Sequence, residues 1–225
     1  MNPSEIYWLD ILNLVQLILI LIGVVIFMIT PKRQRREFLE LGAMLWLAFL
    51  TEATSTIGWY TAGANMNLNY NIANLLNLPI AVLLYRHRIN WNNKNSLAKL
   101  IIIAFVLFGL INLFFIQGPY RFNSYTVTLA SVFFMIISVT YFFVLIQELP
   151  AESITKLPMF WINAAVLIYY SGTFVIYLST DYLANVLKNN MIATWLVHNS
   201  LGTVYYILLS YALVLTRNEH LRETR

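Results

Sequence analysis

The stretch MIATWLVHNSLGTVYYILLSYALVLT, residues 191–216, decides the fold class because it is long and apolar enough to cross a membrane. A helix of about 20 apolar residues spans the hydrocarbon core of a bilayer. Of the 225 residues of the whole chain, 60% are hydrophobic and 11% are charged, and the mean hydropathy is +0.68. This composition is far more apolar than that of a soluble domain. We therefore expect an all-α integral membrane protein, with residues 1–225 forming one transmembrane domain.

Short polar breaks divide the chain into seven apolar runs of helical length, and we expect each run to form one transmembrane helix. The expected helices cover residues 6–30, 38–60, 68–85, 99–116, 124–147, 158–179 and 191–216. The first run is longer than the core of a signal peptide and no small-residue cleavage pattern follows it, so we expect this helix to be retained. The sequence contains no cysteine, which excludes disulfides, thiolate catalysis and cysteine metal sites.

Lysine and arginine residues are concentrated in alternate breaks between the expected helices. Twelve of the 14 follow the first, third, fifth and seventh helices, whereas Arg121 and Lys188 lie on the other side. The positive-inside rule then predicts an outside N-terminus and a cytoplasmic C-terminus. The net charge of +4 reflects this topology and contact with membrane lipid, and we expect no nucleic-acid partner.

Every expected helix carries a polar side chain at a similar depth in the outer half of the membrane. At a rise of about 1.5 Å per residue, Glu52 and His198 lie roughly 10 Å below the outer boundary of a core about 30 Å thick. The other members of this layer are Asn13, Asn77, Asn112, Ser131 and Tyr170. Because polar groups in hydrocarbon are costly, we expect them to face the interior of the bundle and each other, with Glu52 and His198 as partners.

Helical spacing predicts that several polar and aromatic residues share faces that converge on an outward-facing cavity. The four stripes are Glu52, Ser55, Thr56 and Trp59; Asn71, Asn74 and Asn77; Asn163, Tyr170, Thr173 and Tyr177; and Trp195, His198, Asn199, Gly202, Tyr205 and Tyr206. Interhelical hydrogen bonds and aromatic packing that only hold the bundle together are the alternative interpretation, and for most of these positions the more frequent one. At Glu52 and His198 we favour function, because ionisable groups inside a span are usually functional.

The inventory of reactive side chains argues against several chemistries. The last expected helix has no lysine, so a covalent retinal pigment is excluded. His87 and His220 fall on the cytoplasmic side and leave His198 without the further ligands that a metal site needs, so we expect no metal and no cofactor. The sequence also has no phosphate-binding glycine loop, nucleophile elbow or zinc-protease helix motif. We expect no catalytic residues, although Glu52 and His198 could perform acid/base chemistry if they met.

Two stretches resemble a known membrane module. PMFWINAAVLIYYSGTFVIYLSTDYL (158–183) and WLVHNSLGTVYYILLSYAL (195–213) are similar to the last two helices of a seven-helix region at the N-terminus of certain bacterial sensor histidine kinases. The matching positions are Trp161, Asn163, Tyr169, Tyr170, Ser171, Trp195, His198 and Asn199. The resemblance extends to the layout of all seven spans, and it implies a bacterial sensing bundle. The chain ends about nine residues after the last expected helix and carries no kinase core, so signalling would need a separate protein.

Together these patterns predict a multi-pass, receptor-like bundle of the inner (cytoplasmic) membrane that binds a small molecule and signals through a cytoplasmic protein. The expected ligand-binding residues are Glu52, Asn74, Asn77, Tyr170, His198, Asn199, Trp195 and Trp161. A small-solute transporter that uses the same cavity is the second hypothesis. An intramembrane enzyme is the third.

Overall fold

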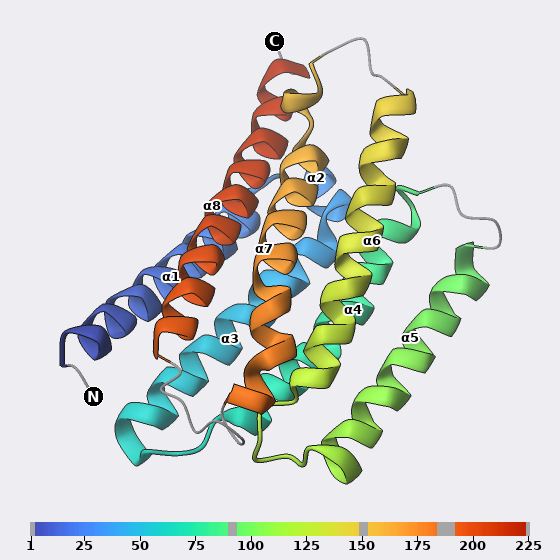
Figure 1. The fold of residues 1–225 in the computed structure, drawn as a ribbon. Coiled ribbons are helices and arrows are strands. Elements are labelled where there is room, and N and C mark those ends of the chain that lie inside the picture. Colours follow the sequence, from blue (N-terminus) through green and yellow to red (C-terminus); the bar gives the residue numbers. More distant parts are fainter. Residues whose placement is uncertain (1–2, 90–93, 149–152, 184–191, 224–225) are drawn as a thin grey trace. The chain divides into compact units, whose positions relative to one another are not determined.

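The computed structural model describes residues 3–89, 94–148, 153–183 and 192–223, and this part of the chain is helical and contains no strand (Figure 1). The α-helices are α1 (Pro3–Ile29), α2 (Lys32–Glu37), α3 (Leu39–Ala62), α4 (Asn67–Arg86), α5 (Lys94–Ile111), α6 (Ser124–Glu148), α7 (Pro158–Asp181) and α8 (Ile192–Glu223). A π-helical segment, η1 (Asn112–Ile116), continues α5, and a 3₁₀ turn, η2 (Ile154–Lys156), precedes α7.

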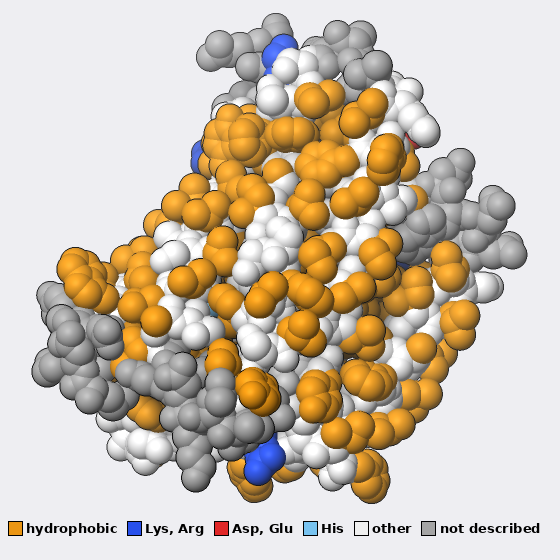
Figure 2. All heavy atoms as spheres, in the orientation of Figure 1, with side chains coloured by type: hydrophobic (Ala, Val, Ile, Leu, Met, Phe, Trp, Pro, Cys, Tyr) orange, Lys and Arg blue, Asp and Glu red, His pale blue; other side chains and the backbone are white. Residues whose placement is uncertain are grey.

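Six helices of the described residues are long and apolar enough to cross a membrane, which is the pattern of a multi-pass membrane protein. They are α1, α3, α5 with η1, α6, α7 and α8. Large apolar side chains are exposed along them, and Figure 2 shows hydrophobic side chains spread over α7 and α8 on the visible face. The third expected helix, residues 68–85, corresponds to α4, which has 20 residues but is more polar than these six because it contains five asparagines.

Local sequence signals explain several helix ends. Pro158 occupies the first position of α7, where its fixed φ suits a helix and its missing N–H costs nothing. Gly63 ends α3 in the left-handed region at φ 58°, and the Ala64 N–H bonds back to the Gly58 carbonyl at 3.2 Å.

Two features of the helices differ from the expectation. The basic break after the first helix forms α2, and α8 continues to Glu223, because its arginine and glutamate residues favour helix and no breaker follows Thr216.

The helices form two compact units, which are described separately. The α7–α8 unit comprises Met1–Glu37 and Ser131–Arg225, and the α3–α5 unit comprises Phe38–Ala130. In the α7–α8 unit, α8 packs along both α7 and α1, and α2 also contacts α8. Ile20, Ile162 and Leu209, one from each of these three long helices, are fully buried. The helix α8 is therefore the central element of this unit.

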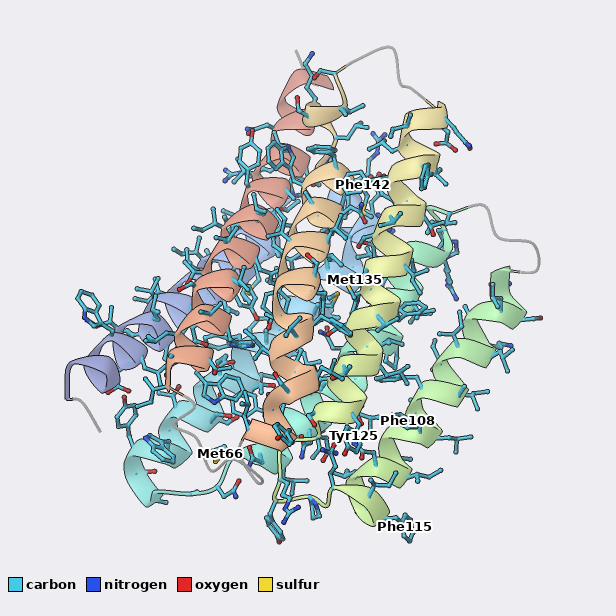
Figure 3. The ribbon with its side chains drawn as sticks, viewed as in Figure 1. Met66, Phe108, Phe115, Tyr125, Met135 and Phe142 are labelled. Carbon is cyan, nitrogen blue, oxygen red and sulfur yellow. The ribbon has the colours of Figure 1, made fainter. Side chains whose placement is uncertain are left out.

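In the α3–α5 unit, α4 packs against α3 on one side and α5 on the other. The contact between α4 and α5 is close at Gly109, where an added Cβ would overlap the Leu75 side chain. Figure 3 shows Phe108 on α5, Phe115 on η1 and Tyr125 at the start of α6. Phe115 projects outward with 84% of its surface exposed, as a lipid-facing side chain would. Its neighbour Asn112 on η1 is completely buried, so this short segment separates an apolar outer side from a polar inner side.

Candidate functional site

His198 on α8 hydrogen-bonds two tyrosines of α7. Its Nε2 atom lies 2.9 Å from the Tyr169 hydroxyl and 2.8 Å from the Tyr177 hydroxyl. The two hydroxyls are also 2.8 Å from each other. These three side chains therefore form a closed triangle of polar atoms at the contact between α7 and α8.

The other side of His198 connects α8 to α1. Its Nδ1 atom lies 3.0 Å from Oδ1 of Asn199, and Nδ2 of Asn199 donates to Oδ1 of Asn13 at 2.7 Å. Gln16, one turn further along α1, donates from Nε2 to the backbone carbonyl of Asn199 at 2.6 Å. Asn13, Gln16, Tyr169, Tyr177, His198 and Asn199 form what we call the His198 network. This network joins three helices.

The amide orientation of Asn199 determines the proton positions in the His198 network. Because Nδ2 of Asn199 donates to Asn13, its Oδ1 is the acceptor for His198, so Nδ1 of His198 carries a proton. The Nε2 atom of a neutral imidazole has one lone pair and accepts from one tyrosine at a time. The other tyrosine then donates to the first. Two arrangements of equal hydrogen-bond number follow, with either Tyr169 or Tyr177 as the direct donor.

Aromatic rings surround the His198 network. Trp195 meets the imidazole edge-on with ring centroids 5.1 Å apart, and Tyr205 contacts Tyr169 at 4.9 Å. Tyr170 points elsewhere, because it stacks on Phe134 of α6 at 4.0 Å. The rings keep the neighbourhood of His198 apolar, which strengthens the hydrogen bonds inside it.

Glycines allow the helices around His198 to approach closely. A Cβ at Gly202 would overlap the Gln16 amide, and a Cβ at Gly172 on α7 would lie 2.8 Å from the Leu201 side chain. The hydrogen bond from Gln16 to Asn199 therefore depends on the missing side chain at Gly202. A shift of α8 along α1 would therefore lengthen or break this hydrogen bond.

Glu52 belongs to the α3–α5 unit, where its partner is a tyrosine. The Tyr70 hydroxyl donates to Oε2 of Glu52 at 3.1 Å. The adjacent Asn69 donates from Nδ2 to the Thr51 carbonyl at 3.0 Å and the Ser55 hydroxyl at 2.7 Å. Glu52 and Ser55 of the stripe expected on the second helix thus bond α4, but through Tyr70 and Asn69, which lie outside the stripe expected on the third helix. Asn71 of that stripe bonds Arg121 and Asn123 instead. The pairing of Glu52 with His198 stays a prediction.

The remaining predicted ligand residues occupy different places. Asn74 and Asn77 are half-buried on α4. Trp161 donates from Nε1 to the Thr155 carbonyl at 2.8 Å and meets Tyr211 edge-on at 5.1 Å. Tyr211 follows His198 by 13 positions on α8, or about 20 Å along a helix. Trp161 therefore lies at the far end of α7 from the His198 network, next to Phe160. Phe160 in turn contacts Phe142 of α6, which is labelled in Figure 3.

Gln16, Gln117, Ser124 and Thr126 were not among the residues expected at a site. Gln16 could have been found, since it is polar within the first span and follows Asn13 at helical spacing. The other three lie around Asn112, which donates to Gln117 at 2.9 Å and to Thr126 at 2.9 Å. Gln117 lies in the break after the fourth expected helix, and Ser124 and Thr126 belong to the first turn of the fifth. The sequence did not indicate that these residues are buried together, because polar residues are common in and next to a loop.

Comparisons with protein-family models, curated proteins and solved structures gave no match for this chain. Among the described residues, no group of three His, Asp or Glu side chains could hold a metal ion. The His198 network itself offers hydrogen bonding and proton rearrangement between imidazole, phenol and amide groups.

Proposed function

We propose that this protein is a receptor-like sensor of a bacterial inner membrane, which binds a small molecule next to the His198 network and signals through a cytoplasmic partner. The observation that carries this proposal is the triangle of His198, Tyr169 and Tyr177, with its two equivalent hydrogen-bond arrangements. A sensor needs an element with two states whose balance a ligand can shift. A molecule that hydrogen-bonds to one of the two tyrosines favours one arrangement over the other.

The connection from the triangle to the cytoplasm is α8. With 32 residues, α8 extends about 48 Å, which exceeds the hydrocarbon core of about 30 Å. His198 lies near one end of α8, and Arg217 and Arg222 lie near the other. A continuous helix moves as a rigid rod, so a change at His198 displaces its basic end. A cytoplasmic protein that docks there would receive the signal.

The proposal includes seven spans, with an outside N-terminus and a cytoplasmic C-terminus. The polarity of α4 is compatible with a seventh span because its asparagines have partners within the α3–α5 unit. Asn69 bonds α3, and Asn71 donates to the Arg121 carbonyl at 2.7 Å and accepts from the Asn123 N–H at 2.9 Å. Polar groups that are satisfied internally are tolerated in a membrane helix. With seven spans, 12 of the 14 basic residues share the cytoplasmic side.

A transporter is the second candidate, and the irregular helices favour it. Carriers commonly build their sites from interrupted helices, and here Pro79 lies inside α4 while η1 ends α5 as a π-helix. Both irregularities belong to the α3–α5 unit, as does Glu52. The residues that support a sensor therefore lie in the α7–α8 unit, and those that support a transporter lie in the α3–α5 unit.

Native mass spectrometry of protein purified gently from membranes tests the sensor proposal. We expect a co-purifying small molecule that is lost from the His198→Phe variant and retained by Tyr182→Phe, a matched aromatic control at the exposed end of α7. The same protein in proteoliposomes should show no flux of that molecule. Flux that Glu52→Gln abolishes would instead establish the transporter, and retention of the molecule by His198→Phe would overturn the proposed site.

A further inference from the structure

The α3–α5 unit contains a second buried polar cluster where η1 meets α6. Asn112 and Ser124 are completely buried, and Asn123, Thr126 and Gln117 are at most 8% exposed. Nδ2 of Asn112 donates to Oε1 of Gln117 and to the Thr126 hydroxyl, each at 2.9 Å. Nε2 of Gln117 donates to the Ser124 hydroxyl at 2.9 Å. We call these five residues the Asn112 cluster.

The hydrogen bonds of the Asn112 cluster do not balance. Both amide hydrogens of Asn112 are used, and Oε1 of Gln117 accepts twice, from Asn112 and from the Tyr125 N–H at 3.1 Å. Two buried carboxamide oxygens, Oδ1 of Asn112 and Oδ1 of Asn123, have no partner. The Thr128 hydroxyl oxygen, one turn beyond Ser124 on α6, has none either. The two asparagine oxygens therefore lack a hydrogen-bond donor or another positively polarised group.

Turning the Asn112 amide over does not remove this deficit. The turned oxygen would face Oε1 of Gln117, so two acceptors would oppose each other. The NH₂ group would then replace the oxygen at the position without a partner. A buried carbonyl left unsatisfied costs about 1 to 3 kcal/mol, so such groups in folded proteins are almost always served by another group or by water. The cluster needs a further component.

The surroundings hold the Asn112 cluster in a fixed shape. In η1 the N–H of Gln117 bonds the Asn112 carbonyl at 2.9 Å, which gives the wide turn of a π-helix. Such turns are often found at functional sites. Asn71 of α4 fastens the loop that follows, through the Arg121 carbonyl at 2.7 Å and the Asn123 N–H at 2.9 Å. The cluster is therefore tied to α4, η1 and α6 before any ligand arrives.

We propose that the Asn112 cluster binds a monovalent alkali cation, Na⁺ or K⁺, through the carboxamide oxygens of Asn112 and Asn123. The five side chains of the cluster offer only neutral oxygen and amide groups. Divalent Ca²⁺ and Mg²⁺ favour carboxylate ligands, whereas carbonyl oxygens replace the hydration shell of monovalent cations in membrane proteins. A cation supplies the positive charge that both oxygens lack. The proposal is independent of any role for His198.

Thermal unfolding of the purified protein in detergent tests the cation site. The melting temperature is measured as NaCl or KCl replaces choline chloride at constant ionic strength. We expect a saturable rise of about 3 to 5 °C at a cation concentration ten times the dissociation constant. Equal melting temperatures in all three salts would overturn the proposal and leave water as the partner of these oxygens.

Two substitutions at Asn123 and one matched control assign the effect to the cluster. Asn123→Ala removes one proposed ligand and should weaken the cation dependence at least tenfold. Asn123→Asp keeps the oxygen, adds a negative charge and should strengthen it. Ser138→Ala removes another buried oxygen without a partner, but one in the α7–α8 unit, and should leave the dependence unchanged. A cation response that is the same in all three variants would place the ion elsewhere and refute the assignment.

Discussion

The His198 network and the Asn112 cluster differ in whether they leave a buried polar atom without a hydrogen-bond partner. In the His198 network each polar atom that faces another helix has a partner, from Asn13 on α1 to Tyr177 on α7. In the Asn112 cluster both amide hydrogens of Asn112 are used, but the carboxamide oxygens of Asn112 and Asn123 have no partner. The difference shows that similar polarity in an apolar chain can have two meanings. A closed network joins helices and can switch between arrangements, whereas an open one has acceptors to offer to another component.

The chemistry of the side chains explains this contrast. Imidazole and phenol groups both donate and accept, so a ring of His198, Tyr169 and Tyr177 can satisfy itself in more than one way. A carboxamide has separate donor and acceptor ends, so Asn112 can use its NH₂ group fully and still leave its oxygen without a partner. Four substitutions, three in the His198 network or its helix contacts and one in the Asn112 cluster, test this contrast.

The largest effect is expected from Gly202→Leu, which separates α1 from α8. The new side chain would displace the Gln16 amide and break its bond to Asn199. Overpacking and the lost hydrogen bond together should lower the free energy of unfolding by about 3 to 5 kcal/mol, measured by thermal or denaturant unfolding in detergent. Ser200→Ala, on an exposed position of the same helix, should change it by less than about 0.5 kcal/mol. Similar values for both variants would mean that the close contact contributes little.

Asn112→Leu should come next, because it deprives Gln117 and Thr126 of their donor at a completely buried position. We expect a loss of about 2 to 3 kcal/mol in the same unfolding measurement. Phe115→Leu, on the exposed side of η1, is the matched control and should cost less than about 0.5 kcal/mol. A neutral Asn112→Leu would indicate that the cluster contributes no net stability.

His198→Phe should have a smaller effect, because it leaves the two tyrosine hydroxyls hydrogen-bonded to each other. We expect a loss of about 1.5 kcal/mol, since one acceptor and the link to Asn199 disappear. The loss should be less than additive with Tyr177→Phe, with a coupling of about 0.5 to 1 kcal/mol in a double-mutant cycle. Strict additivity would show that these residues do not act as one network.

Tyr177→Phe by itself should be the mildest change, at about 0.5 kcal/mol. Tyr169 then becomes the only direct donor to His198, so the network keeps its connection but loses one of its two arrangements. If the sensor proposal is right, this variant should keep nearly normal stability yet respond more weakly to the bound molecule. The response can be followed as ligand-dependent protection of α8 from hydrogen exchange. An undiminished response would show that the second arrangement is not used.

The long apolar runs of the sequence predicted most of the fold. Helices were expected at residues 124–147 and 158–179, and they are found at Ser124–Glu148 and Pro158–Asp181. The length of an apolar run is enough to predict such a helix, and Pro158 marks the start of α7. Residue-by-residue patterning did not predict α2, because a run of charged residues has no apolar face to reveal a helix. It also did not predict the π-helical end of α5, which depends on the tertiary contacts of Asn112.

The candidate site was predicted only where depth and helical face coincided. His198 and Asn13 were placed at one level, and hydrogen bonds connect them through Asn199, which was expected on the same face as His198. Trp161 was selected from the resemblance to the sensor-kinase helices but lies at the other end of α7, because resemblance in sequence carries no information on depth. The Asn112 cluster could not be recognised, since its loop residues are buried only by the packing of η1, α4 and α6.

The polarity of α4 has a consequence for how the chain enters the membrane. A helix with five asparagines gains little by leaving water alone, because hydrocarbon offers its amides no partners. The side-chain NH₂ group of Asn69 has three acceptor oxygens of α3 within hydrogen-bond distance, those of Thr51, Thr54 and Ser55. If α4 is the seventh span, as proposed above, we expect α3 and α4 to insert as a helical hairpin during synthesis, because α3 offers the amides of α4 the hydrogen-bond partners that hydrocarbon lacks.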